Sequence, residues 1–267
     1  MERRRFLKTS LAVSALASTS SAIAQTPTLT PISTVGGREF YLLRRYHMVS
    51  GPQLKLTESY FAGALLPALA RMALGPVGAF KLDFGPETPA YYLLIPGLSL
   101  EPLAELDLRL GLDAEFLAAA APFWNATAGS PAFERVESWL LVAFAGWPQL
   151  TSPAAKSKRI FQLRTYESPS NGEHVRKVEM FHSGEFEIFK AAGFHPVFFG
   201  DTLVGSHMPS LTYMLSFADM TELEAKWNVF RNAPAWKQLL ADPRFAFDPI
   251  VSNISNLLLS PLDCSQI

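Results

Sequence analysis

The fold is decided by residues 159–241, which begin with Arg159-Ile160-Phe161-Gln162-Leu163-Arg164-Thr165-Tyr166 and end with Ala235-Trp236-Lys237-Gln238-Leu239-Leu240-Ala241. The pattern of apolar residues in this stretch predicts a strand, a helix, two strands and a second helical region. An earlier stretch that begins at Phe40 follows the same order. An internal repeat determines most of an architecture, so this correspondence is the strongest structural signal in the chain.

The repeat can be followed residue by residue. A shift of 120 positions places Tyr41–Tyr46 over Phe161–Tyr166. Further along, the Trp-Asn pair and the Pro-Ala-aromatic triplet of residues 124–133 recur in residues 227–236, at a shift of 103. Tryptophan is rare, so this shared spacing favours a true repeat over two unrelated amphipathic helices. The first copy is longer by about 18 residues, which predicts an insertion at residues 97–116.

Both copies are predicted to have the order β-α-β-β-α-β. In the second copy the predicted strands span 160–167, 194–203, 211–217 and 249–259, and the predicted helices span 173–192, 219–231 and 234–240. In the first copy the predicted strands span 39–48, 77–84, 89–95 and 137–145, and the predicted helices span 52–72 and 114–126, with a short helical turn at 131–135. Pro67 is expected to kink the first of these helices or to end it early.

This order is that of the ferredoxin-like fold, an α+β fold whose sheet carries helices on one face only. The strand at 39–48 has apolar or aromatic residues on both faces, so both faces are expected to be covered. We therefore predict two tandem ferredoxin-like domains, packed sheet to sheet as a pseudo-dimeric α/β barrel with the helices outside. In this arrangement Arg44, Tyr46, Arg164 and Tyr166 are expected to point into the seam between the two sheets.

Residues 1–24 are predicted to be an export signal. Residues 3–8 contain R-R-x-F-L-K, which resembles the twin-arginine signal, and Ala22-Ile23-Ala24 precedes Gln25 as a small-residue cleavage site. The apolar run between them is too short to span a bilayer in the mature protein. We therefore expect a bacterial protein that is exported by the twin-arginine route and is periplasmic or secreted.

The remaining boundaries follow from composition. A segment rich in Thr, Ser, Pro and Gly predicts a linker at 25–37, and a second such segment predicts a linker at 149–158. The two domains are then expected at 38–148 and 159–267.

The composition excludes several classes of protein. An apolar fraction of 49% argues for a well-packed globule and against disorder. Removal of residues 1–24 would lower the formal net charge from −1 to about −4, so no nucleic-acid partner is expected. Cys264, the single cysteine, cannot form an internal disulfide; it is a free thiol or an intermolecular link. A homo-oligomer and a protein partner both remain open.

The second copy resembles the NIPSNAP family. The resemblance is carried by Phe161–Tyr166, Pro196–Gly200, Leu211–Leu215 and Trp227, together with Asn232–Lys237. It covers roughly residues 159–262 well and the first copy only weakly. It implies the dimeric α/β barrel fold, but the family has no agreed catalytic motif, so it implies no active-site residue.

The residues expected in the seam are the first candidates for a ligand site. An arginine there, Arg44 or Arg164, could bind a carboxylate, and Tyr46 or Tyr166 could donate a hydrogen bond to an oxyanion. The alternative is an interdomain salt bridge with a packed ring, which the presence of the pattern in both copies favours.

Histidine and aromatic residues supply further candidates. His182 is expected on the buried stripe of its helix, between Glu179 and Glu185, and the alternative there is an ordinary hydrogen-bonded histidine. Trp227, Trp236 and Tyr213 could line an aromatic pocket, or could be core residues. The remaining histidines are scattered, and no metal, haem or phosphate motif is visible, so no metal and no cofactor is expected.

Two functions are therefore weighed. In the first, the protein binds a small organic molecule in the barrel cleft and, in one version, converts it by oxygenase or isomerase chemistry. Arg164 would then hold an anionic group, and Tyr166 or His182 would move a proton. In the second, the protein is a non-enzymatic scaffold with a filled barrel, and the leucine-rich insertion is its contact surface. An open cleft containing Arg164 would favour the first function.

Overall fold

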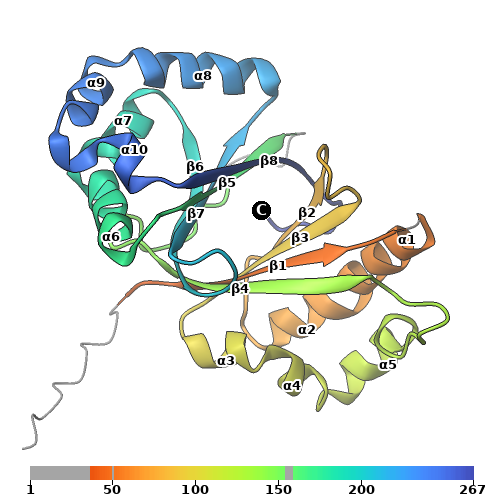
Figure 1. Cartoon of the computed structure of the whole chain (residues 1–267). Coiled ribbons are helices and arrows are strands. Elements are labelled where there is room, and N and C mark those ends of the chain that lie inside the picture. Colours follow the sequence, from red (N-terminus) through yellow and green to blue (C-terminus); the bar gives the residue numbers. More distant parts are fainter. Residues whose placement is uncertain (1–36, 50, 154–158) are drawn as a thin grey trace, which may run out of the picture. The chain divides into compact units, whose positions relative to one another are not determined.

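Eight antiparallel strands close into a barrel in the computed structural model, which describes residues 37–49, 51–153 and 159–267. The strands follow each other around the barrel in the order β1-β3-β2-β8-β5-β7-β6-β4 (Figure 1). The predicted signal peptide at 1–24, nearly all of the linker at 25–37 and part of the linker at 149–158 lie outside the described residues. Gly37–Ile267 form one compact unit.

The first half of the barrel comprises the elements from β1 to β4. They are β1 (Phe40–His47), α1 (Gly51–Tyr60), the π-helical turn η1 (Phe61–Leu65), α2 (Leu66–Arg71), β2 (Gly78–Leu82), β3 (Ala90–Gly97), α3 (Leu100–Ala104), α4 (Leu106–Leu110), α5 (Ala114–Trp124) and β4 (Arg135–Ala143).

The second half comprises the elements from β5 to β8. They are β5 (Ile160–Glu167), α6 (Asn171–Met180), the π-helical turn η2 (Phe181–Glu185), α7 (Phe186–Ala191), β6 (His195–Val204), β7 (Ser210–Phe217), α8 (Met220–Asn232), α9 (Pro234–Leu240), the 3₁₀ turn η3 (Pro243–Phe245), α10 (Phe247–Ile250) and β8 (Asn253–Pro261).

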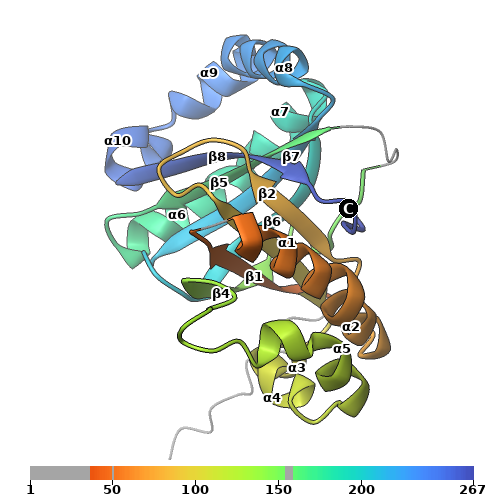
Figure 2. The ribbon, with the colours of Figure 1, turned by 90° about the vertical axis from the view of Figure 1, so that its right-hand side faces the viewer.

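Each half is a ferredoxin-like sheet, and the two sheets share edges. The strand order is β4-β1-β3-β2 in the first half and β8-β5-β7-β6 in the second. The halves are joined where β2 pairs with β8 and where β4 pairs with β6. The helices of each half lie outside the barrel (Figures 1 and 2). The predicted α+β barrel is confirmed, and its closure leaves no free sheet edge.

The strand registers confirm the repeat. Arg44 lies opposite Leu93 on β3, and Arg164 lies opposite Tyr213 on β7, so the shift of 120 continues through the third strand of each half. On the other side, Arg44 lies opposite Ser138 and Arg164 opposite Asn256. These pairs define which positions correspond in the two halves.

The prediction that Arg44, Tyr46, Arg164 and Tyr166 point into the seam between the two sheets is wrong. Side chains such as Tyr41, Leu43 and Phe161 fill the barrel interior, packed with Phe198 and Met214 from across the barrel. The alternating positions Arg44, Tyr46, Arg164 and Tyr166 instead point outward, to the layer between sheet and helices. Both faces of these strands are covered, so apolar alternation alone could not tell the two faces apart.

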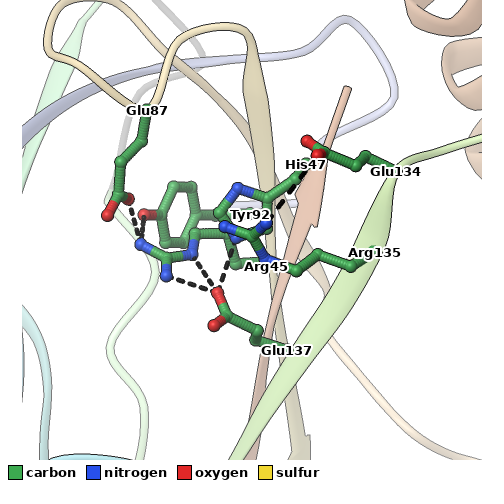
Figure 3. A network of polar contacts seen from close by, with 7 residues as sticks. All are labelled: Arg45, His47, Glu87, Tyr92, Glu134, Arg135 and Glu137. Atoms are coloured by element: carbon green, nitrogen blue, oxygen red, sulfur yellow. Dashed lines mark hydrogen bonds and ion pairs between the residues drawn. The ribbon is translucent and has the colours of Figure 1, made fainter. Parts of the chain in front are cut away.

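A polar network occupies the barrel interior at the ends of β1 and β4. Arg45 lies between Glu87 and Glu137, and its guanidinium also meets the Tyr92 hydroxyl at 3.5 Å (Figure 3). The Nε2 atom of His47 lies 2.6 Å from the same Glu137 carboxylate. The interior is therefore filled by apolar side chains and by these paired charges, which is the filled barrel that the scaffold alternative required.

The π-helical turns shift the phase of the long helices. Pro67 was expected to kink the first helix; a π turn, η1, lies directly before it, and the helix continues. In the second half, η2 adds one residue to a turn, so Glu185 turns inward. His182, predicted to be on the buried stripe, is exposed. Val175, which precedes η2, is 64% exposed because α6 buries His174, Lys177 and Met180 instead. A periodicity of 3.6 residues cannot reveal such a change of phase.

The structure also shows the form of the insertion, and it differs from two further expectations. The insertion is helical, because Leu103, Leu106 and Leu110 bury one side of α3 and α4. Residues 131–135 form no helical turn. The last strand begins at Asn253, because α10 occupies the start predicted for it. No helix among the described residues is long and apolar enough to cross a membrane.

Candidate functional site

A cleft of about 410 Å³ lies between the sheet and the helices of the second half. Its floor is made by Gln162, Arg164 and Tyr166, the outward-facing residues of β5, with Asn256 of β8 beside them. Helices α6 and α8 and the turn η2 form its walls, with Trp236 contributed by α9.

Arg164 is the one cation on the floor of this cleft. Its Nη2 donates to the Tyr166 hydroxyl at 2.7 Å, and its guanidinium lies 4.7 Å from the ring centre of Trp227. Its Nε is buried and has no acceptor among the described residues, and no carboxylate in this part of the chain forms an ion pair with it. A guanidinium stays charged at all physiological pH values, so the cleft offers a positive charge to a ligand.

Lys177 and Glu185 form a buried ion pair in the wall of the cleft. Their Nζ and Oε2 atoms are 2.9 Å apart, and their side chains are 1% and 4% exposed. The Lys177 ammonium also lies 4.5 Å from the Phe181 ring centre and 5.2 Å from that of Tyr166. Gly184, which precedes Glu185 in the π turn, has a φ of 145°, a conformation that other residues rarely reach.

Aromatic rings enclose the cleft and are held by hydrogen bonds. Trp227 Nε1 donates to Gln162 Oε1 at 2.7 Å, and Gln162 Nε2 donates to Asn256 Oδ1 at 2.9 Å. Trp236 packs against Phe230 with ring centres 4.7 Å apart. This chain of donors fixes the indole and the amide before a ligand arrives, which lowers the entropic cost of binding.

Tyr213 lies behind the cleft. Its ring stacks on that of Tyr166 at 5.8 Å, and the residue is fully buried. Burial raises the pKa of the Tyr213 hydroxyl well above its ordinary value, so the hydroxyl stays protonated. Tyr213 therefore supports Tyr166 and does not line the cleft.

The equivalent place in the first half is occupied by the chain itself. The guanidinium of Arg44 is held by Asp107 of α4 through two bonds of 2.8 Å, from Nη1 to Oδ1 and from Nη2 to Oδ2. Leu103, Leu106 and Leu110 of the insertion are buried in the same core as Tyr46. The insertion thus places a carboxylate on the arginine and an apolar body beside it.

The polar residues of the second cleft are also missing from the first half. At the positions of Gln162, Lys177, Glu185 and Tyr213, the first half has Leu42, Thr57, Leu65 and Leu93. Only one of the two equivalent places therefore keeps both an accessible arginine and a buried charged pair.

The predicted candidates divide between these places. Arg164 and Tyr166 lie together in the cleft with Trp227 and Trp236, and Arg44 and Tyr46 lie in the closed first half. His182 belongs to neither, because its Nδ1 hydrogen-bonds to the Val178 carbonyl and its Nε2 accepts from the Gly146 amide. Among the described residues, no three His, Cys, Asp or Glu side chains gather to hold a metal ion.

Sequence reasoning missed Lys177 and Glu185 as site residues. The available signal was the comparison of the two copies, because charged residues stand where the other copy has Thr57 and Leu65. Charged side chains at positions that are buried in the repeat are seldom retained without a polar partner.

A larger hollow, of about 910 Å³, lies between α7 and α9 but is less suited to a ligand. Its lining is mostly small or apolar, including Ala191, Ala235 and Leu239. Its one cation, Arg244, is already paired with Asp242 at 2.7 Å and with Glu179 at 2.9 Å. We therefore assign the site by its chemistry to the smaller cleft.

Comparisons with known proteins found a family model that matches part of the chain and solved structures of similar fold. Residues 161–266 match the NIPSNAP family model. A candidate monooxygenase from Lactobacillus acidophilus NCFM shares the fold with a TM-score of 0.55 and 8% identity, over 84% of this chain and 94% of that chain. A second one, from Fusobacterium nucleatum, has a TM-score of 0.54 and 8% identity, over 84% and 93%.

A NIPSNAP-like domain protein from Burkholderia xenovorans has a TM-score of 0.35 and 16% identity, over 39% of this chain and 86% of that chain. No curated protein sequence matches the chain. At these identities the solved structures show the dimeric α/β barrel fold alone.

Proposed function

We propose that the second half of the chain, in which residues 161–266 match the NIPSNAP family model, binds a small aromatic carboxylate in the cleft between β5 and the helices. The observation that carries the proposal is the contrast between the two arginines. Arg44 is neutralised by Asp107, whereas the corresponding Arg164 faces a cleft without a carboxylate partner among the described residues.

The first half indicates the ligand class. There the chain supplies a bidentate carboxylate to Arg44 and leucine side chains beside it. A ligand of the second half would present a carboxylate to Arg164 and an apolar body to Trp227 and Trp236, and the flat indoles favour an aromatic body. The cleft volume suits a ligand of one or two rings.

Thermal shift and calorimetric titration test this proposal with benzoate, phenylacetate and phenylpyruvate, and with the uncharged phenylacetamide as the matched control. We expect the carboxylates to stabilise the protein and phenylacetamide to have no effect. Arg164→Gln should weaken binding about ten- to a hundredfold, because a charge-assisted hydrogen bond contributes about 1.5–3 kcal/mol.

The repeat supplies the control variant. Arg44→Gln removes the corresponding guanidinium from the closed first half, so affinity should stay at the wild-type value even if stability falls. Equal loss of affinity in both variants, or binding of phenylacetamide as tight as that of phenylacetate, would contradict the proposal.

We also propose that the protein is exported by the twin-arginine route. The support is the arrangement of R-R-x-F-L-K, a short apolar run and Ala22-Ile23-Ala24 in residues 1–24. Cell fractionation should find a form that begins at Gln25 outside the cytoplasm. Replacement of Arg3 and Arg4 by Lys should retain the uncleaved protein in the cytoplasm; unchanged export would contradict the proposal.

A further inference from the structure

The buried pair Lys177–Glu185 has no evident role in stability. Replacement of a buried ion pair by apolar residues of similar volume is often neutral or stabilising, since both charges lose their hydration. The first half does without such a pair, because Thr57 and Leu65 occupy the corresponding positions and are fully buried, with the Thr57 hydroxyl lacking a hydrogen-bond partner among the described residues. The fold therefore does not need the pair, and its presence in the second half calls for another explanation.

The pair lies against the proposed ligand site. Lys177 and Glu185 line the same cleft as Arg164, and Tyr166 contacts both Arg164 and Lys177. The Tyr166 hydroxyl accepts from Arg164, while the Tyr166 ring faces the Lys177 ammonium at 5.2 Å. The cleft thus combines an anion-binding group with an adjacent carboxylate and ammonium that are themselves 2.9 Å apart.

We propose that Glu185 and Lys177 are catalytic residues that transfer protons within a bound aryl 2-oxo carboxylate, so that the cleft catalyses keto–enol tautomerisation. This inference rests on the proposed function, because Arg164 must first hold the ligand carboxylate. A carboxylate base beside an ammonium acid is the combination that removes a proton from carbon while a neighbouring carbonyl becomes a hydroxyl.

The protons and electrons of this tautomerisation are all accounted for by the ligand and the Lys177–Glu185 pair. Glu185 takes a proton from the carbon next to the ligand carbonyl, and the electrons of that C–H bond form a carbon–carbon double bond. The carbonyl π electrons move to oxygen, which takes a proton from the Lys177 ammonium. The proton on Glu185 then crosses the 2.9 Å hydrogen bond to Lys177, which restores both charges. The reverse steps return the keto form, and nothing is consumed.

The pair is suited to this transfer because it is dry. Both side chains are buried, and their Nζ and Oε2 atoms are already joined by a hydrogen bond of 2.9 Å. The proton is handed over without reorganisation of solvent.

The test is hydrogen–deuterium exchange at the methylene carbon of phenylpyruvate. The exchange is followed by proton NMR in D₂O in the presence of the full-length protein. We expect the wild-type protein to accelerate exchange above the buffer rate. Glu185→Gln keeps the shape and a hydrogen bond to Lys177 but removes the base, so the catalysed exchange should fall about a hundredfold. Calorimetry should show that this variant still binds phenylpyruvate.

The repeat again offers a matched variant. Lys177→Thr combined with Glu185→Leu installs the residues of the first half, and we expect it to fold and to lose exchange. If wild-type protein binds phenylpyruvate without accelerating exchange, or if Glu185→Gln exchanges at the wild-type rate, the proton-transfer role is wrong and the binding function stands. If wild-type protein does not bind phenylpyruvate, both claims fail for this ligand class.

Discussion

At the scale of single residues, the cations packed against the sheet differ in whether a carboxylate pairs with them. Arg44 has Asp107, Lys177 has Glu185, and Arg45 shares Glu87 and Glu137. Arg164 differs because its guanidinium donates to a neutral hydroxyl, that of Tyr166. A partly buried cation without a carboxylate partner is costly, so it marks the place where an anionic ligand would be stabilising.

Glu137 provides a prediction about pH. Burial acts to raise the pKa of Glu137, but hydrogen bonds from His47 and Arg45 outweigh it and hold the pKa below its usual value. A carboxyl group whose pKa is lower in the folded state adds stability at pH values above its pKa in the unfolded state, which is about 4.3. This stability is lost as the pH falls through the pKa of the folded state. Glu137→Gln should therefore cost stability at pH 7, and the difference from wild type should shrink towards pH 3.

Chemical denaturation at several pH values measures this difference. Because the Glu137 side chain is 33% exposed, the expected cost at pH 7 is modest, about 1 kcal/mol. Glu115→Gln, which alters a more exposed pair with Arg71, serves as the control and should have little effect at any pH. A cost of Glu137→Gln that does not change with pH would refute the assignment.

At the scale of elements, the insertion decides the difference between the two halves. Its length was visible in the repeat, but its helices and its contact with Arg44 were not, since no local pattern tells which distant side chain Asp107 will meet. The inserted segment does expose Leu98, Leu108 and Leu112, which suits the contact surface of the scaffold alternative. Its buried leucines, however, show that its first role is to close the first half.

Asp107→Ala tests this role. It leaves the Arg44 guanidinium, whose side chain is 9% exposed, without its carboxylate and should cost about 1–2 kcal/mol, discounted because the Asp107 side chain is 60% exposed. Added acetate should raise the melting temperature of this variant by binding to Arg44 in place of the Asp107 carboxylate, whereas the same concentration of chloride should not.

The control for this rescue is the double variant Asp107→Ala with Arg44→Leu, which removes the anion-binding group as well. It should show no effect of acetate beyond that of chloride. Equal stabilisation of both variants by acetate would mean that the anion acts elsewhere.

The elements themselves were largely predictable. The strand at Ile160–Glu167 and the helix at Pro234–Leu240 have the predicted bounds, because alternation and a proline at the helix start are local signals. The buried side of the long helix was not predictable, since it depends on how α6 and η2 pack. Helix α6 buries His174 and Lys177 instead of Val175, and His182 lies on the exposed side.

At the scale of the whole molecule, the repeat predicted the barrel but not its function. Two copies of a ferredoxin-like sheet cover each other within one chain, so the interior becomes core, and the cleft that contains Arg164 lies outside, beneath the helices. The residues expected in the sheet–sheet seam were therefore assigned to the wrong face, and Arg164 and Tyr166 line the cleft beneath the helices instead.

The most direct test of this account is a crystal structure of the protein soaked with phenylacetate. We predict one bound molecule per chain, with its carboxylate on Arg164, its ring between Trp227 and Trp236, and Asp107 still on Arg44. Density for the ligand inside the barrel, or in the hollow between α7 and α9 with the Arg164 cleft empty, would contradict the account.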